Sequence, residues 1–182
     1  MTIAIFCAAN SDIPQIYYTR TRELCQWLAH EGHTIIFGGC DVGLMGCVAH
    51  STSEAGGRVI GVVPRVFINN PLRPLPHLDE LIPCENLSDR KDILISHADC
   101  CIALPGGVGT MDEVFHVVAQ ASVGYHQKPT LLYNINGFWD ALWQQIERMG
   151  NEHMLRPNLP ATLRVFNTLD DCKNLITELF QH

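Results

Sequence analysis

The sequence predicts an α/β protein: an open parallel sheet with helices on both faces, forming a single domain over residues 1–182. Short apolar runs alternate with helical patterns along most of the chain, which is typical of a parallel sheet with crossover helices. Several of these runs end in a polar or glycine-bearing turn, where open α/β sheets bind their ligands. The length suits one domain, and 47% hydrophobic with 17% charged residues is an ordinary globular composition.

The first third of the chain contains three strands and two helices in this prediction. A polar turn follows the first apolar run, and Pro14 suits the first turn of a helix that stops at Gly32. The second run ends at Gly38-Gly39 and the third at Pro64. The predicted strands are residues 3–8, 34–37 and 59–63, and the helices are residues 17–30 and 43–55.

Residues 64–83 contain five prolines, too many for a helix or a central strand. We interpret them as a long surface excursion. They could form part of a lid over a ligand or a plain irregular loop.

The alternation then resumes to the end of the chain. The predicted strands are residues 100–104, 130–133 and 163–166, and the helices are residues 87–97, 110–123, 138–149 and 170–180. The helix at 110–123 is apolar almost all round. Such a helix lies either within the core or against another subunit.

Composition excludes several classes of protein. A formal net charge of −7 argues against a nucleic-acid partner or an anionic membrane surface. The sequence shows no secretory signal and no apolar run of membrane-spanning length, so a cytoplasmic location is expected. The eight cysteines include no C-x-x-C pair, and Cys100-Cys101 lies in a predicted buried strand, where thiols behave as small apolar groups.

The segment from Asp99 to Phe115 is the strongest candidate for a site. A buried strand is followed by Pro105, three glycines and a helix, so backbone N–H groups and the helix dipole can bind an anion. Glu113 stands three residues after Thr110, which is also the spacing of a capping box, so a purely structural role is an alternative.

The usual nucleotide and hydrolase motifs do not match. The glycine turn lacks the Lys-Ser/Thr of a P-loop, and no G-x-G-x-x-G follows the first strand. No histidine pair has the spacing of a helical zinc site, and no serine lies in a G-x-S-x-G elbow. Arg90 lies in the first turns of a predicted helix, where a cation opposes the helix dipole, so a structural role for it is disfavoured. With the usual motifs excluded, Arg90 and Glu113 remain as the candidates for chemistry. Arginine binds phosphate, and a carboxylate stabilises the positive charge that develops when a glycosidic bond breaks, so these residues permit a nucleotide hydrolase.

Two motifs resemble those of the LOG (Lonely Guy) family, the cytokinin riboside 5′-monophosphate phosphoribohydrolases. Ser88-Asp-Arg90-Lys91 and Leu104-Pro-Gly-Gly-Val-Gly-Thr-Met-Asp-Glu113 are similar to the family's R-K and P-G-G-x-G-T-x-x-E. The resemblance implies a Rossmann-like fold and a homodimer with active sites at the interface. It also implies hydrolysis of N6-modified AMP or of AMP to a free base and ribose 5-phosphate, without a metal or cofactor.

The same resemblance implies roles for individual residues. Arg90 and Glu113 are the expected catalytic pair, with Lys91 beside the 5′-phosphate. The residues expected to bind the phosphate are Gly106, Gly107, Val108, Gly109 and Thr110, and those expected elsewhere around the substrate are Asn10, Ser11, Gly39 and Met45. The glycines at 38–46 could instead serve only the close packing of a helix on a strand.

The chain departs from the family in two places. The first turn has Ala9-Asn10 where Gly-Ser is common, and Val66-Phe67 stand where plant enzymes carry an acidic residue. Relatives have been labelled lysine decarboxylases, but nothing in the sequence suggests a pyridoxal phosphate site. The alternative function is a non-catalytic carrier of a nucleotide or of a phosphorylated cofactor.

Overall fold

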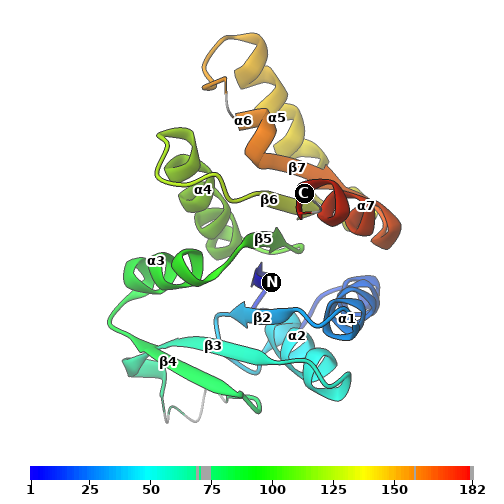
Figure 1. The fold of residues 1–182 in the computed structure, drawn as a ribbon, viewed down its shortest axis with the longest axis vertical. Coiled ribbons are helices and arrows are strands. Elements are labelled where there is room, and N and C mark those ends of the chain that lie inside the picture. Colours follow the sequence, from blue (N-terminus) through cyan, green and yellow to red (C-terminus); the bar gives the residue numbers. More distant parts are fainter. Residues whose placement is uncertain (69, 71–74, 158, 181–182) are drawn as a thin grey trace.

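The computed structural model describes residues 1–68, 70, 75–157 and 159–180. Seven strands form one sheet in the order β4-β3-β2-β1-β5-β6-β7, and all neighbouring strands are parallel (Figure 1). The strands are β1 (Thr2–Phe6), β2 (Thr34–Phe37), β3 (Val59–Pro64), β4 (Glu80–Cys84), β5 (Cys100–Ala103), β6 (Thr130–Tyr133) and β7 (Leu163–Phe166). The predicted open parallel sheet is therefore confirmed.

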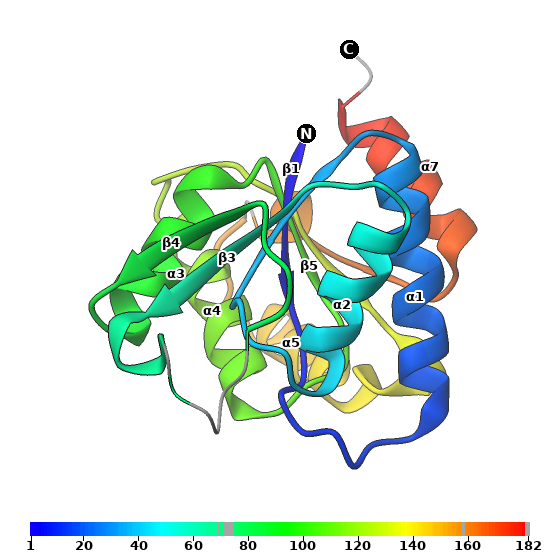
Figure 2. The same cartoon turned by 90° about the horizontal axis from the view of Figure 1, so that it is seen from below.

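Helices cover both faces of the sheet, as predicted (Figure 2). The helices α1, α2 and α7 contribute to one buried cluster, and α3, α4, α5 and α6 contribute to the other. Their bounds are α1 (Gln15–His30), α2 (Gly43–Glu54), α3 (Leu87–His97), α4 (Val108–Ser122), α5 (Asp140–Asn151), α6 (Leu159–Thr162) and α7 (Leu169–Phe180). Short 3-10 turns, η1 (Arg65–Phe67) and η2 (Ile135–Gly137), follow β3 and β6.

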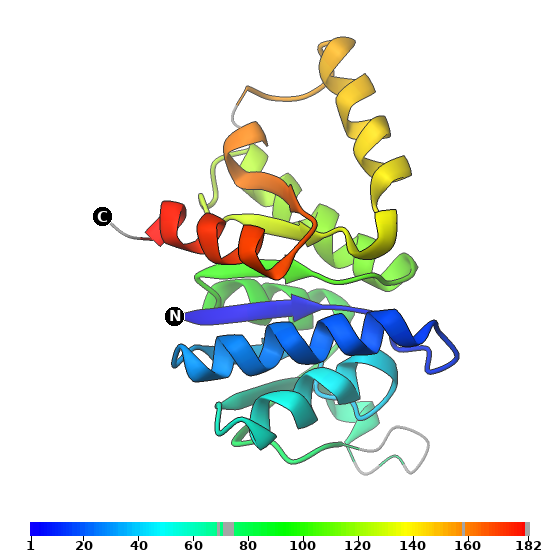
Figure 3. The same cartoon turned by 90° about the vertical axis from the view of Figure 1, so that its right-hand side faces the viewer.

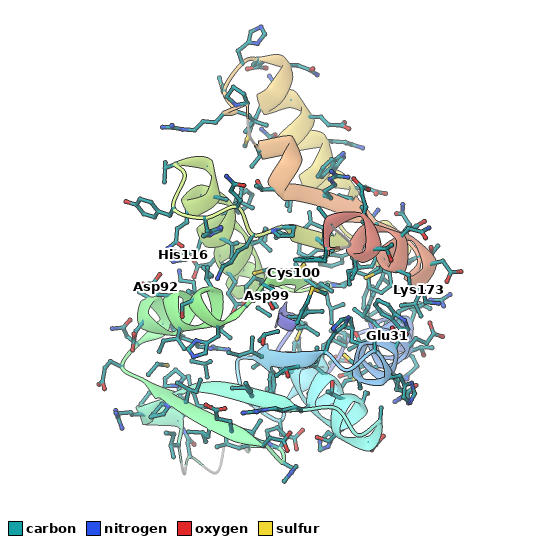
Figure 4. The ribbon with its side chains drawn as sticks, in the orientation of Figure 1. Glu31, Asp92, Asp99, Cys100, His116 and Lys173 are labelled. Atoms are coloured by element: carbon teal, nitrogen blue, oxygen red, sulfur yellow. The ribbon has the colours of Figure 1, made fainter. Side chains whose placement is uncertain are left out.

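The central strands are buried on both faces because each has helices above and below it. In β5, Cys100 (labelled in Figure 4) belongs to the cluster on one face. Cys101 belongs to the cluster on the other face, so the vicinal pair fills both halves of the core. Burial raises the pKa of Cys101 to about 12. All eight cysteines are free thiols, and those of β5 pack as apolar side chains, as the sequence predicts.

The proline-rich segment was interpreted wrongly at its end, because β4 lies within it. Pro83 is compatible with a strand because β4 is at the edge of the sheet and pairs only with β3. The described residues 75–79 lead into β4, and Leu78 among them packs over Gly61 of β3. Residues 69 and 71–74, and with them Pro71 and Pro74, lie outside the described residues, so the lid prediction stays untested there.

Other differences concern the ends of elements. The first strand ends at Phe6 rather than at Ala8, because the Ala8 N–H turns toward the carbonyl of Pro105 and donates to it at 3.1 Å. The helix expected from Thr110 starts two residues earlier, and the one expected from Phe138 starts two residues later, after η2. The four-residue α6 was not predicted. No helix among the described residues is long and apolar enough to cross a bilayer.

Candidate active site

The candidate site lies at the carboxyl ends of the central strands. Figure 3 shows β1 running from the amino-terminus toward the loop that leads into α1, and the turns after β2 and β5 lie at the same edge. The chain leaves β1 for β2 on one side, whereas β5 lies on its other side. This reversal of strand order is the place where open α/β sheets bind ligands.

The turn after β5 forms an open helix N-terminus. The N-cap of α4 is Gly107, and the first backbone bond of the helix runs from Met111 N–H to the carbonyl of Gly107. Among the described residues, no acceptor contacts the N–H groups of Val108, Gly109 or Thr110. Three free N–H groups at the positive end of a helix dipole favour an anion.

Glycine occupies the positions of this turn for different reasons. A Cβ on Gly106 would collide with the side chain of Thr110, which is buried against it. A Cβ on Gly107 or Gly109 would meet nothing within 4 Å, so both open onto free space. Because Gly107 caps the helix, Thr110 is not the N-cap, and the capping-box alternative for Glu113 is wrong.

The helix α3 supplies the cations of the site. The side chain of Asn86 accepts hydrogen bonds from the N–H groups of Ser88 and Asp89 at 2.9 and 3.0 Å, so it fixes the first turn of α3. Arg90 and Lys91 project from the next positions toward α4. Further along, Asp92 of α3 contacts His116 of α4 at 2.9 Å, which helps to hold the two helices together (Figure 4).

Arg90 and Glu113 face each other between these helices. Arg90 Nη2 lies 3.9 Å from Glu113 Oε1, and the side chains are only 14% and 16% exposed. Among the described residues the guanidinium makes no hydrogen bond, and its Nε is buried without a partner. A buried cation without hydrogen bonds is costly, so its position indicates a ligand-binding role rather than a structural one.

The environment of Glu113 favours its neutral form. Burial raises the pKa of Glu113 to about 7, Arg90 and Lys91 oppose this rise, and Asp112 adds to it. The buried thiols of Cys7 on the β1 side and of Cys101 in β5 are the other titratable groups near this carboxylate. A carboxyl group that titrates near neutral pH suits proton transfer or charge stabilisation in an active site.

A second ion pair lies beside the first. Lys91 Nζ donates to both carboxylate oxygens of Asp112, at 2.7 and 2.8 Å, so residues 90 and 91 of α3 pair with residues 113 and 112 of α4. Asp112 is a residue of the site that was not predicted from the sequence. The signal was available, because two adjacent cations on one helix match two adjacent acids on the next.

The glycine turn after β2 borders the same pair. A Cβ on Gly38 would coincide with the guanidinium of Arg90 and approach Met45 Cε, and Met45 is buried there. Gly39 has a φ of +77°, and a Cβ on it would collide with Val63. Gly39 is thus packed against β3 rather than against a helix, and its expected role at the substrate stays a prediction, while Met45 lies next to Arg90.

Asn10 and Ser11 have local partners. The side chain of Asn10 accepts a hydrogen bond from Asp12 N–H, and Ser11 Oγ accepts one from Gly43 N–H at 3.1 Å. Ser11 lines a surface hollow of about 330 Å³ with Asp41 and His50. No described contact brings either residue to Arg90 or Glu113, so their expected role at the substrate stays a prediction. No cluster of potential metal ligands occurs among the described residues.

Comparisons with known proteins give a consistent family. The family model described as "Possible lysine decarboxylase" matches residues 45–179. Cytokinin riboside 5′-monophosphate phosphoribohydrolase LOG5 of Arabidopsis thaliana is 31% identical over 177 residues, which cover 97% of this chain and 76% of that protein. The cytokinin riboside 5′-monophosphate phosphoribohydrolase of Rhodococcoides fascians is 33% identical over 156 residues, or 86% of this chain and 79% of that protein.

Solved structures share the fold. The molybdenum cofactor carrier protein of Chlamydomonas reinhardtii has a TM-score of 0.75 at 19% identity, covering 100% of this chain and 98% of that one. The molybdenum cofactor binding protein of Rippkaea orientalis has a TM-score of 0.73 at 22% identity, covering 98% and 96%. At these identities the likeness shows the fold alone.

Proposed function

Because the chain belongs to the LOG family of cytokinin riboside 5′-monophosphate phosphoribohydrolases, we propose that it cleaves the N-glycosidic bond of nucleoside 5′-monophosphates. The substrates are N6-modified AMP, such as isopentenyl-AMP, or AMP itself, and the products are the free base and ribose 5-phosphate. The observation that carries this proposal is the buried Arg90–Glu113 pair close to the open N-terminus of α4.

The 5′-phosphate occupies the turn after β5. The N–H groups of Val108, Gly109 and Thr110 donate to its oxygens, and the α4 dipole adds to the attraction. Lys91 lies one residue from Arg90 and is held by Asp112, so its charge contributes at short range. Binding through the phosphate places the ribose next to the carboxylate of Glu113.

The chemical step separates charge at the ribose. The C1′–N bond breaks with its electron pair going to the base, and the ribosyl carbon gains positive charge that the Glu113 carboxylate stabilises. A water molecule adds to C1′ and loses a proton to Glu113, while the departing base takes up a proton from solvent. Glu113 then returns its proton to solvent, so the net reaction consumes one water molecule. Arg90 donates hydrogen bonds from its free N–H groups, which orients the substrate and stabilises the departing base.

The description "lysine decarboxylase" is not carried over to this chain. A pyridoxal phosphate enzyme needs a lysine that forms an imine with the cofactor. Lys91 and Lys173 are paired with Asp112 and Asp170, and Lys128 donates to the carbonyls of Ile95 and Ser96 at the end of α3. All three lysines therefore have structural partners.

The direct test is release of base from AMP and from isopentenyl-AMP, followed by chromatography. We expect free base and ribose 5-phosphate in equal amounts from at least one substrate. No release from either, while a family enzyme is active in the same assay, would overturn the proposal. Tight nucleotide binding by calorimetry without release would instead favour the carrier function.

We also propose a homodimer in which α4 lies at the interface. Val108 is 78% exposed and Phe115 39% exposed on this helix, and the exposed Val123 follows its end. These residues form an apolar stripe that starts at the candidate phosphate turn, so a second copy on this stripe would lie close to the site.

The dimer is expected to show twice the chain mass of 20.3 kDa in light scattering. A Phe115→Glu variant should shift the mass toward the monomer, because it places a charge in the apolar contact. Leu81→Glu, at an equally exposed position (38%) on the edge strand β4, is the matched control and should leave the mass unchanged. A monomer mass for the unmodified chain would contradict the prediction.

A further inference from the structure

Gly38 lies where the guanidinium of Arg90 is held. It follows β2 directly and is buried. Of the atoms that a Cβ on Gly38 would meet, the nearest are Arg90 Nη2, then Arg90 Cζ at 2.5 Å and Met45 Cε at 2.6 Å. The position that a methyl group would take is thus already filled by the cation of the candidate site.

The backbone does not explain this glycine. Gly38 is absent from the residues with a positive φ, so its conformation is open to other amino acids. Its neighbour Gly39 differs, because φ there is +77° and the obstacles are Val63 and the backbone of Gly61. The two adjacent glycines are therefore required for different reasons. Gly39 is required by the backbone and its packing on β3, and Gly38 by the position of the Arg90 side chain.

We propose that Gly38 is a positioning residue, whose missing side chain creates the slot that holds the Arg90 guanidinium opposite Glu113. Met45 closes the slot, since its buried side chain places Cε 2.6 Å from the position of the same Cβ. The slot explains how a cation with no hydrogen bond among the described residues stays near Glu113, because steric contacts confine it. The catalytic consequence rests on the proposed function, but the placement does not.

The test is Gly38→Ala, read first without any substrate. The methyl group must displace Arg90, whose charge lowers the pKa of Glu113, so the Glu113 carboxyl should titrate above about 7. The titration is followed by carbon NMR of the carboxyl group, assigned with Glu113→Gln. The other charged groups facing Glu113, namely Lys91 and Asp112, stay in place.

The second reading is kinetic. A displacement of about 1 Å is expected to lower kcat about 100-fold. KM should change less, because the phosphate turn is untouched. Gly150→Ala is the matched control, since its methyl group would meet only Leu155 Cδ1 at 3.7 Å, and it should change neither reading.

A double variant separates the slot from ordinary packing. In an Arg90→Ala background, Gly38→Ala should have less than a twofold further effect on either reading, because no side chain from position 90 then fills the slot. If Gly38→Ala does not fold, restoration of folding by Arg90→Ala supports the slot, and failure to restore it overturns the slot. Unchanged titration and kcat in a folded Gly38→Ala, or an equal effect in both backgrounds, would overturn it. A chain without base release would refute the proposed function while the titration still decides on the slot.

Discussion

Replacing Glu113 with glutamine is expected to lower kcat for base release about 1,000-fold while the protein stays folded. Glutamine keeps the size and shape of the side chain, so the contacts with Arg90 and the buried surroundings change little. It cannot take a proton from water, and it carries no negative charge to stabilise the ribosyl cation. The loss should therefore fall on kcat rather than on KM.

Stability should move the other way, and its pH dependence gives a second check. Burial raises the pKa of Glu113 from 4.5 to about 7. Below pH 4.5 the carboxyl is neutral in the folded and the unfolded chain. Between 4.5 and about 7 the unfolded chain ionises first, so the stability of the folded state falls as pH rises. Above about pH 7 the carboxyl is ionised in both states, and the loss of folded-state stability has reached its full size of roughly 3 kcal/mol.

The glutamine variant lacks this titration. Its free energy of unfolding should approach or exceed that of the unmodified protein above pH 7, measured by urea denaturation at pH 5 and pH 8. Glu147→Gln, on the exposed side of α5, serves as the control for both readings. Unchanged turnover would remove Glu113 from the mechanism, and a loss of stability that grows with pH would contradict the burial argument.

The sequence predicts most strands because buried parallel strands are apolar along most of their length, as β2, β5 and β6 show. The strand β4 is not predicted because it lacks such an apolar run. An edge strand is only half covered, and its residues Glu80, Leu81 and Pro83 are exposed. Whether Pro83 is compatible with a strand depends on the absence of a further neighbour, which local sequence does not reveal.

In the candidate site, too, local features can be predicted from the sequence, whereas contacts between distant elements cannot. The glycine turn and the acid after it are local features, so the sequence alone indicates an anion site there. The pairing of Arg90 with Glu113 depends on how α3 packs against α4. Elimination of other motifs left these two residues as candidates, and the family resemblance implied that they act as a catalytic pair. The role of Gly38 is the hardest to predict from the sequence, because nothing in a run of glycines tells which one faces a side chain from another helix.

Replacing Arg90 with methionine should cost activity without costing stability. Methionine approximately fills the volume beside Gly38 and Met45, and it removes a buried cation that has no hydrogen bond among the described residues. At pH 5, where Glu113 is neutral in the folded chain, the buried cation gains little from one long contact of 3.9 Å, so an apolar side chain of similar size should be tolerated or stabilising at that pH. The thermal midpoint should stay the same or rise.

Activity should fall by about 100- to 1,000-fold in kcat/KM, because the departing base loses the donors that stabilise it. The pH profile separates this effect from the effect on Glu113. In the unmodified enzyme kcat/KM should rise with pH through about 7, as the free enzyme's Glu113 ionises. Arg90 opposes the rise in that pKa, so its removal should move the midpoint of the profile upward.

Arg148→Met provides the comparison, because Arg148 is an exposed arginine paired with Glu152 on α5, and it should alter neither the rate nor the midpoint. A fall in rate with an unmoved midpoint would mean that Arg90 acts on the substrate but does not influence Glu113. A destabilised Arg90→Met chain would mean that the cation belongs to the packing of α3 on the sheet. Loss of rate, a raised midpoint and kept stability together require that this guanidinium is held near the carboxylate for chemistry at the expense of the fold.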